Sequence, residues 1–448
     1  MSVPTNGVRK PHVLYVAWGF PPCRGGGVYR ALATANALAE AGMSVTVLTA
    51  DRDTFVRFTG TDESLEARID PSITVHRVAF DWPALEWDLR KWPKSRIMAP
   101  KWWEARRRKE DQKIFPEPGY GAWRPRLEQA AEQIHRANPI DVVVTTANPA
   151  VDYSPAWYLY RTYGVPYFAD QRDGWTLDVF SGDRLHEPAS PVGKWETDFI
   201  GAAQEFWVVN EPIHVWYAAA YPEVAARMRV VMNGWDDDVA TADDVPVVEP
   251  HDEVRFAYVG TVSKMVPLPE FIDGWRLARS TDALGPSTAS VFGYLGFFHT
   301  ANASLLSAFD EADDDQVIYA GPVPKAEVHT VYENADVLLL MLGAGKYVTS
   351  GKVFEFMASG LPIVSIHGLD NACTPLLRDY PGWFPAASLS AVDIADALSK
   401  AAAAARTDTE QQRQARVEYA QRFRRDRQLA PAIGSVTELA SKRAEGRR

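Results

Sequence analysis

Short, continuously apolar runs alternate along this chain with longer segments in which apolar residues recur every three or four positions. The continuous runs predict strands that are buried on both faces, as in a parallel sheet, and the spaced pattern predicts helices. We expect strands at 12–20, 44–50, 140–145, 165–169 and 205–209, and a second series at 255–259, 290–294, 316–319, 337–341 and 362–365. This alternation predicts an α/β protein built from right-handed βαβ units.

The chain has 448 residues, which is more than one hydrophobic core ordinarily serves, so we expect two domains. An acidic, proline-containing segment at 237–253 separates the two series of strands. We place a first Rossmann-like domain at 1–235, completed by a C-terminal helix at 426–448. The second Rossmann-like domain is expected at 250–425.

The segment TSGKVFEFMASGLPIV, residues 349–364, is the most informative part of the sequence. Its first residues are small and precede a short helix, whose N-terminal N–H groups can bind an anion. These residues are Thr349, Ser350 and Gly351. Lys352 and Glu355 are three positions apart and therefore share one helix face. A carboxylate there can accept hydrogen bonds from a ribose diol, so the segment is suited to a ligand that carries both a diphosphate and a diol.

Three adjacent glycines, Gly25–Gly27, follow the first strand and open a helix. Gly26 and Gly27 would let a ligand approach the backbone and leave helix N–H groups available for an anion. The spacing does not match the G-x-G-x-x-G pattern of dinucleotide sites. A tight turn without a ligand is the alternative. Arg30, one turn further on, would either reach the same anion or lie at the surface.

The segment PYFADQRDGW, residues 166–175, predicts a strand that ends in a polar tip. Open α/β sheets bind ligands at the carboxyl ends of their strands, so Arg172 and Asp173 are candidate site residues. The alternative is a buried Arg–Asp pair that only braces the loop.

Taken in order, these motifs resemble a retaining GT-B glycosyltransferase of family 4, especially the branch that builds cell-surface polysaccharides. The motifs are the glycine loop, the R-D-x-W tip at 172–175, the N-G-x-D junction at 233–236, the Y-V-G turn at 258–260 and the Lys352/Glu355 helix. The resemblance implies two Rossmann-like domains that face each other across a deep cleft. It also implies a nucleotide-diphosphate sugar in the second domain, an acceptor hydroxyl in the first, and front-side transfer with retention of configuration.

The same resemblance implies roles for single residues. Asp173 would position the reacting sugar or accept the acceptor proton, and Arg172 would support a phosphate or that carboxylate. Glu355 would hold the ribose of the donor. The remaining donor-binding roles would fall to Lys352, Lys264, Ser350, Gly351, Thr349, Gly26 and Gly27. The donor would be a UDP- or GDP-sugar, and neither a metal nor another cofactor is implied.

Two positions depart from the family pattern. Thr261 stands where many members have an arginine, and Tyr347 stands where the leading glutamate would be, eight residues before Glu355. The missing glutamate indicates a different donor sugar, a local gap or lost activity. Both departures keep open the alternative of a non-catalytic GT-B protein that binds glycans or a partner. A nucleotide-sugar epimerase, which would use similar nucleotide contacts without an acceptor, is a further alternative.

The stretch 82–113 interleaves tryptophans with basic residues and, from Glu86 to Lys113, has a net charge of +5 in a chain of net charge −11. Such a mixture suits a peripheral contact with an anionic membrane, which fits a glycan or lipid-linked acceptor. The alternative is a charged insertion whose tryptophans pack inward, in which case a soluble small-molecule acceptor is equally suitable. The overall negative charge argues against nucleic acid as a partner. The two cysteines suggest no disulfide framework, and we expect a cytoplasmic protein, at the inner face of the membrane if the lipid contact exists.

Overall fold

The computed structural model describes residues 9–81, 86–236, 252–263, 266–295, 309, 316–343 and 345–446. The chain divides into two compact units, Met1–Met232 with Gln428–Arg448, and Asn233–Arg427. The chain thus leaves the first unit after Met232 and returns to it within its last helix. The predicted start of the second domain, residue 250, lies outside the described residues, as does the predicted linker up to residue 251.

The first unit contains a seven-stranded sheet in the order β3-β2-β1-β4-β5-β6-β7, and its strands all pair in parallel. The strands are β1 (His12–Val16), β2 (Ser44–Ala50), β3 (Thr74–Val78), β4 (Val142–Ala147), β5 (Tyr167–Gln171), β6 (Phe206–Val208) and β7 (Met228–Val230). The two edge strands, β3 and β7, were not predicted, because their partly exposed residues lack a continuous apolar run. The first strand is shorter than expected and ends at Val16.

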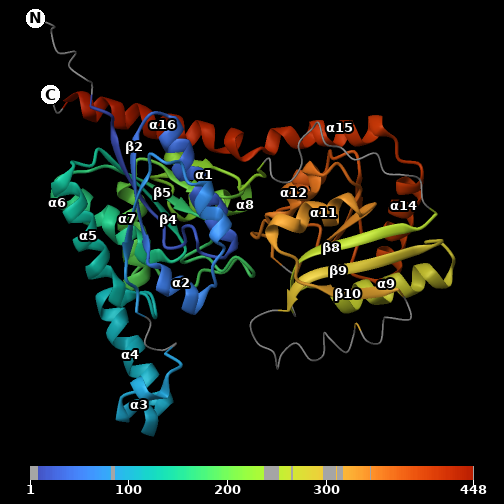
Figure 1. Cartoon of the computed structure of the whole chain (residues 1–448), viewed down its shortest axis with the longest axis horizontal. Coiled ribbons are helices and arrows are strands. Elements are labelled where there is room, and N and C mark those ends of the chain that lie inside the picture. Colours follow the sequence, from blue (N-terminus) through green and yellow to red (C-terminus); the bar gives the residue numbers. More distant parts are fainter. Residues whose placement is uncertain are drawn as a thin grey trace, which may run out of the picture. The chain divides into compact units, whose positions relative to one another are not determined.

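Helices cover both faces of this sheet (Figure 1). The covering helices are α1 (Gly26–Glu40), α2 (Arg52–Phe58), α5 (Arg124–Ala137), α6 (Tyr153–Tyr163), α7 (Pro191–Ala202), α8 (Glu211–Ala220) and α16 (Arg425–Gly446). Two further helices, α3 (Lys94–Met98) and α4 (Pro100–Ile114), extend away from the sheet (Figure 1). On one face, Leu38 of α1 and Val436 of α16 share a hydrophobic cluster with the aliphatic side chains of β1, β2 and β4. On the other face, Tyr167 of β5 stacks on Phe199 of α7 and donates a hydrogen bond to its carbonyl oxygen.

The second unit has a six-stranded sheet in the order β10-β9-β8-β11-β12-β13, again with parallel pairing. The strands are β8 (Val254–Val262), β9 (Ser287–Leu295), β10 (Val317–Gly321), β11 (Val337–Met341), β12 (Ile363–Ile366) and β13 (Trp383–Pro385). Strand β8 continues through the residues expected to form the Y-V-G turn, so Thr261 lies within the strand.

The helices of the second unit are α9 (Leu268–Ser280), α11 (Val328–Glu333), α12 (Lys352–Ala358), α13 (Thr374–Leu377), α14 (Ala391–Arg406) and α15 (Glu410–Ala420). Trp275 of α9 and Leu398 of α14 are completely buried in one cluster with the strands. Short 3₁₀ helices complete the two units: η1 (Glu63–Arg68), η3 (Leu89–Lys91), η4 (Gly121–Trp123), η5 (Ala150–Asp152), η6 (Ala225–Arg227), η9 (Lys325–Glu327) and η10 (Gln421–Phe423).

Each unit is therefore a Rossmann-like layer structure whose strands all end at one edge of the sheet, where ligands bind in open α/β folds. The prediction of a mixed α/β chain with two such sheets is confirmed. Among the described residues, no helix combines the length and the apolar character that crossing a bilayer requires.

Candidate functional site

In the second unit, Glu355 lies at the centre of a polar cluster drawn from two segments. It projects from the first turn of α12, and Lys352 of the same helix places its Nζ atom 2.8 Å from Oε2. Lys325, which opens η9 after strand β10, places its Nζ atom 2.7 Å from Oε1. The hydroxyl of Tyr332 in α11 donates to Oε2 at 3.0 Å. Both carboxylate oxygens thus have a cationic partner, and the shared helix face predicted for Lys352 and Glu355 is confirmed.

The two lysines decide the ionisation of Glu355. Burial by itself would raise the pKa of this carboxyl group, but the charges of Lys352 and Lys325 and their hydrogen bonds outweigh burial and lower the pKa to about 2. The side chain of Glu355 is 17% exposed, whereas those of Lys325 and Lys352 are 23% and 26% exposed. Glu355 is therefore a fixed anion, while the flexible lysine side chains keep access to solvent and can exchange one anionic partner for another.

The small residues before α12 are partly engaged with the protein itself. The hydroxyl of Ser350 accepts a hydrogen bond from the N–H of Lys352, and its carbonyl accepts one from Val353. A Cβ atom at Gly351 would meet no heavy atom within 4 Å, so the space beside this residue is open. Thr349 is partly buried just before them. Since two of the N–H groups at the helix start already have partners, most of the positive charge at this site comes from Lys325 and Lys352.

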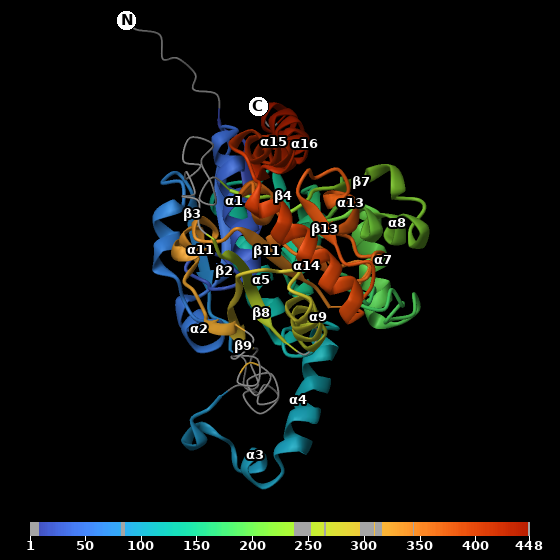
Figure 2. The same cartoon turned by 90° about the vertical axis from the view of Figure 1, so that its right-hand side faces the viewer.

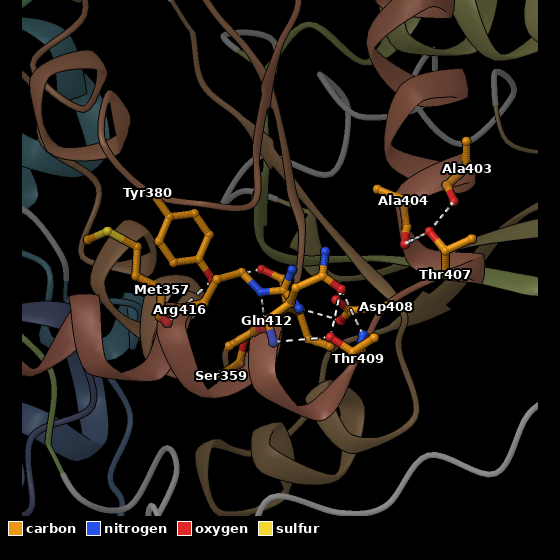
Figure 3. Close-up of polar contacts among 12 residues, drawn as sticks. Met357, Ser359, Tyr380, Ala403, Ala404, Thr407, Asp408, Thr409, Gln412 and Arg416 are labelled. Carbon is orange, nitrogen blue, oxygen red and sulfur yellow. Dashed lines mark hydrogen bonds and ion pairs between the residues drawn. The ribbon is translucent and has the colours of Figure 1, made fainter.

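The far end of α12 is held by a second set of contacts (Figure 3). Gly360 adopts a φ of +71°, the left-handed conformation that often ends a helix, and its carbonyl accepts a 2.6 Å hydrogen bond from Nε of the buried Arg416. Arg416 also pairs with Asp408, and the hydroxyl of Tyr380 donates to the carbonyl of Leu361 at 2.8 Å. These contacts fix the turn between α12 and β12, and so they fix the helix that presents Glu355.

In the first unit, Arg172 and Gly27 lie together, Arg172 directly after β5 and Gly27 in the first turn of α1, the helix that follows β1. Strand β4 lies between β1 and β5 in the sheet. Arg172 follows β5, and its Nε atom donates to the carbonyl of Ala147 at 2.9 Å while an Nη atom donates to the carbonyl of Asn148 at 2.8 Å. Its other Nη atom lies where a side chain on Gly27 would start, since a Cβ atom there would be 1.7 Å away. The guanidinium group therefore lies against the first turn of α1, whose N-terminal end is positive as well.

Asp173 is exposed, and its Oδ2 atom accepts a 3.1 Å hydrogen bond from the amide of Asn148. Exposure of Asp173 contradicts the alternative of a buried Arg–Asp pair, because Arg172 bonds to carbonyl oxygens and Asp173 bonds to a side-chain amide. Asn148 thus contacts both predicted residues. Sequence reasoning did not select Asn148, which follows β4 with no motif to mark it.

The glycines of the first unit differ in what they do. A Cβ atom on Gly25 or Gly26 would meet nothing within 4 Å, and Gly25 has extended backbone, so only Gly27 is required by a close contact. The interpretation of Arg30 as an anion ligand or a surface residue is wrong. Its guanidinium group is completely buried and makes two hydrogen bonds, of 2.7 and 2.8 Å, to the carboxylate of Asp170 in β5.

Two acidic residues near the end of β4 were missed by sequence reasoning. Glu117 accepts hydrogen bonds from the N–H groups of Ala150 and Val151, at 2.9 and 2.7 Å. Burial raises the pKa of Glu117 to about 7 against the effect of these two hydrogen bonds. The completely buried Asp152 accepts a 2.6 Å hydrogen bond from the N–H of Trp18, and burial raises its pKa as well. Neither acid lies in a segment with a recognisable motif.

In the second unit, sequence reasoning missed Lys325 and Tyr332, whose only signal was their place after strand β10. Lys264, the other cation expected at the donor site, lies outside the described residues. The ring centre of Tyr347 lies 5.8 Å from the ammonium group of Lys346. Each unit therefore brings predicted residues together with unpredicted ones at the carboxyl edge of its sheet.

No protein-family model matches the sequence, and no curated protein matches it either. The structure is similar to a sucrose-phosphate synthase from Thermosynechococcus elongatus, with 15% identity and a TM-score of 0.62 over 97% of this chain and 99% of that one. It is also similar to Anabaena HepE in complex with UDP, with 13% identity and a TM-score of 0.63 over 95% of this chain and 100% of that one.

A third similar structure is a UDP-N-acetylglucosamine 2-epimerase candidate from Listeria monocytogenes, with 10% identity and a TM-score of 0.54 over 96% of each chain. Together with the two all-parallel sheets, these matches show that the chain has the GT-B fold. At such low identity they define the fold and leave the chemistry to the residues of the site.

Proposed function

We propose that this protein is a glycosyltransferase that moves a sugar from a nucleotide-diphosphate donor to an acceptor hydroxyl with retention of configuration. The cluster of Glu355 with Lys325 and Lys352 carries the proposal. It combines a permanently ionised carboxylate with two partly exposed cations at the carboxyl edge of a parallel sheet, which are the groups needed for a ribose diol and a diphosphate. The binding of UDP by HepE, which has the same fold, supports a UDP-sugar as the first donor to test.

Donor binding would exchange the partners of this cluster. The diphosphate would draw the ammonium groups of Lys325 and Lys352 away from Glu355, which frees its two oxygens to accept hydrogen bonds from the ribose. The ion pairs therefore hold both lysines in place before the donor binds. On binding, each lysine exchanges the carboxylate of Glu355 for the diphosphate. Lys325 supplies a cation that the family pattern would have placed at the position of Thr261.

The first unit would bind the acceptor. Arg172 and the first turn of α1 together form a positive region that suits a phosphate, and the exposed carboxylate of Asp173 is available to orient a sugar hydroxyl. In a front-side reaction, the bond from the anomeric carbon to the diphosphate breaks as the bond to the acceptor oxygen forms on the same face. The acceptor proton passes to the departing diphosphate, so neither a protein nucleophile nor a metal is needed, and the lysines offset the developing charge.

We further propose that the acceptor belongs to cell-surface glycan or glycolipid assembly, as the family resemblance implies. A soluble small-molecule acceptor and a non-catalytic glycan-binding role are the alternatives. Epimerisation of the donor sugar is a distinct candidate, favoured by the structural similarity to an epimerase candidate.

A turnover assay on the full chain distinguishes these functions. The protein is incubated with UDP-glucose, UDP-N-acetylglucosamine and GDP-mannose, each alone, with a membrane lipid extract, and with a pool of soluble sugars and alcohols. Released nucleotide is quantified, and NMR of the products reports the anomeric configuration. Glu355→Gln is compared with Glu327→Gln, which changes an exposed glutamate of the neighbouring η9.

We expect one nucleotide to be released only when an acceptor is present, and the product to have the same anomeric configuration as the donor. The turnover rate should fall at least ~30-fold in Glu355→Gln and stay unchanged in Glu327→Gln. Release that requires lipid extract would identify a lipid-linked acceptor. An epimerised donor sugar without transfer would replace the transferase proposal with epimerisation, and nucleotide binding without turnover would replace it with a binding role.

A further inference from the structure

Helices α3 and α4 form an arm, residues 86–114, that extends away from the sheet of the first unit (Figures 1 and 2). Its base is anchored by Phe115, whose ring stacks on Trp175 with 5.5 Å between ring centres. Trp175 is the last residue of the R-D-x-W tip. The arm is therefore joined to the segment that carries the candidate acceptor residues.

Only part of the arm's aromatic surface is used to hold the arm together. The guanidinium group of the buried Arg96 lies between two indole rings, 3.8 Å from the ring centre of Trp92 and 4.8 Å from that of Trp103. Trp92 also donates to the carbonyl of Glu86 at 2.7 Å. The inward-packing alternative is thus correct for these two tryptophans. Trp82 lies outside the described residues.

The other large apolar side chains of the arm are directed to solvent. Those at its outer end are Trp87, Leu89, Ile97, Met98 and Trp102, with exposed fractions of 78%, 64%, 58%, 85% and 54%. Trp87 lies just before η3 and Leu89 opens it, Ile97 and Met98 end α3, and Trp102 lies in the first turn of α4, so these side chains gather at one end of the arm. Isolated exposed apolar residues are common, but five in sixteen consecutive positions need an explanation.

Exposed cations accompany these apolar side chains. Arg90, Lys91, Lys94 and Lys101 are all exposed. Arg90 pairs with Asp88 and Lys91 with Glu86, two acids that are only partly exposed. The arm is therefore positive in a chain whose net charge is −11. An anionic surface would repel the rest of the protein and attract this end of it.

We propose that the outer end of the arm docks on an anionic lipid bilayer, with Trp87, Met98 and Trp102 inserted at the headgroup level. Alternating indole, aliphatic and basic groups match that layer, where ring edges and ammonium groups stay hydrated while apolar parts leave water. A nucleic acid or an acidic protein would be recognised by the charges but would leave Met98 and Ile97 exposed. The exposed apolar side chains therefore favour lipid.

Flotation of the full-length protein with vesicles tests this docking. One set of vesicles contains phosphatidylglycerol and phosphatidylcholine in equal amounts, and the other contains phosphatidylcholine alone. The apolar variant is Met98→Ser with Trp102→Ser, and its control is Val215→Ser, an exposed valine of α8. The charge variant is Lys94→Glu with Lys101→Glu, and its control is Lys400→Glu with Lys442→Glu, which changes the net charge equally at exposed sites elsewhere.

We expect the wild type and both controls to float with the anionic vesicles and not with the neutral ones. Each lost cation should weaken binding by about fivefold, the equivalent of about 1 kcal/mol, and each reversal by more. The apolar variant should also bind at least tenfold more weakly. Thermal stabilisation by UDP, measured in the same variants, should be unchanged, which separates this proposal from the proposed function.

Four results would overturn the proposal. One is equal binding by the arm variants and their controls, and another is equal binding to neutral vesicles. The third is tight binding to polyuridylic acid that the apolar variant leaves unchanged, because it would identify the arm as a polyanion-binding surface. A dimer in light scattering that the apolar variant dissociates would equally replace lipid with a second copy of the chain.

Discussion

Each unit contains a carboxylate held in an ion pair, but the two pairs differ in burial and in how far the cation can move. In the first unit, Asp170 faces the rigid fork of Arg30, and both side chains are 2% exposed. In the second unit, Glu355 faces Lys325 and Lys352, which are about a quarter exposed. Arg30 also donates to the carbonyl of Val231, so its hydrogen bonds join β5 to the chain after β7.

This difference separates a structural pair from one available to a ligand. Moving Arg30 would leave two buried charges without compensation, so no ligand can exchange with it. Lysine Nζ atoms at the surface of the second unit can turn to a new anion at little cost, because water screens them during the exchange. The type of cation and its exposure, rather than the presence of an ion pair, therefore indicate where a diphosphate would bind.

The largest expected effect comes from breaking the pair in the first unit. Arg30→Ala leaves Asp170 charged and buried, and we expect a loss of about 3–5 kcal/mol in the free energy of unfolding. Urea denaturation followed by circular dichroism measures this loss. Arg52→Ala, which removes a half-exposed arginine from its ion pair with Glu63, should cost less than about 1 kcal/mol. A similar loss in both variants would contradict the structural role of Arg30.

Glu117 differs from both pairs because no described residue forms an ion pair with it, so its effect on stability should change with pH. The pKa of Glu117 is raised from 4.5 to about 7, so the protonated form is favoured in the folded protein. Its contribution to stability is complete below about pH 4.5 and is lost as the pH rises through 7. Allowing for partial exposure, we expect Glu117→Gln to gain about 2 kcal/mol relative to the wild type between pH 5 and pH 8.

Chemical denaturation at pH 5, 6, 7 and 8 measures the effect of Glu117→Gln, and Glu223→Gln at an exposed position is the control. Glu355 should behave in the opposite way. Its pKa is lowered to about 2, so its contribution is constant above about pH 4.5 and is lost only as the pH falls toward 2. Parallel pH profiles for wild type and Glu117→Gln would show that Glu117 does not titrate in this range.

The smallest expected effect on stability comes from Lys325→Met. Its removal leaves Lys352 and Tyr332 as partners of Glu355, so we expect a loss of less than about 1 kcal/mol in unfolding free energy. Nucleotide affinity should nevertheless fall by about 10–100-fold, since a charged hydrogen bond contributes roughly 1.5–3 kcal/mol. Calorimetric titration measures the affinity. Unchanged affinity, with Lys352→Met as the comparison, would exclude Lys325 from the donor site.

The sequence was sufficient to predict the two sheets apart from edge strands. It predicted only some of the residues in the polar clusters around Glu355 and Arg172. The strand at 337–341 has the expected bounds because it is a continuous, fully buried apolar run, and the strand at 44–50 is recognised by its valines and leucine although threonines interrupt them. The edge strands β3 and β7 lack such runs and were missed. Lys352 and Glu355 could be paired from their spacing, since residues three apart on a helix are neighbours.

Contacts between residues that are far apart in the chain could not be predicted, because they leave no local pattern in the sequence. Lys325 is 30 positions from Glu355, and Asp170 is 140 positions from Arg30. The spacing of Arg30 showed that it lies one turn into a helix, but it did not show which helix face the sheet would cover. Gly27 was predicted to let a ligand approach the backbone, and in the structure the guanidinium group of Arg172 lies against it.

The most direct test of the donor site is a thermal-shift measurement of nucleotide binding. The wild type, Glu355→Gln and Glu327→Gln are each measured with UDP, GDP, TDP and ADP. We predict that one nucleotide stabilises the wild type and Glu327→Gln by about 2.7 kcal/mol at a concentration of about 100 Kd, and that Glu355→Gln loses most of this gain. Stabilisation that is equal in all three proteins, or absent with every nucleotide, would contradict the assignment of Glu355 and its lysines as the donor site.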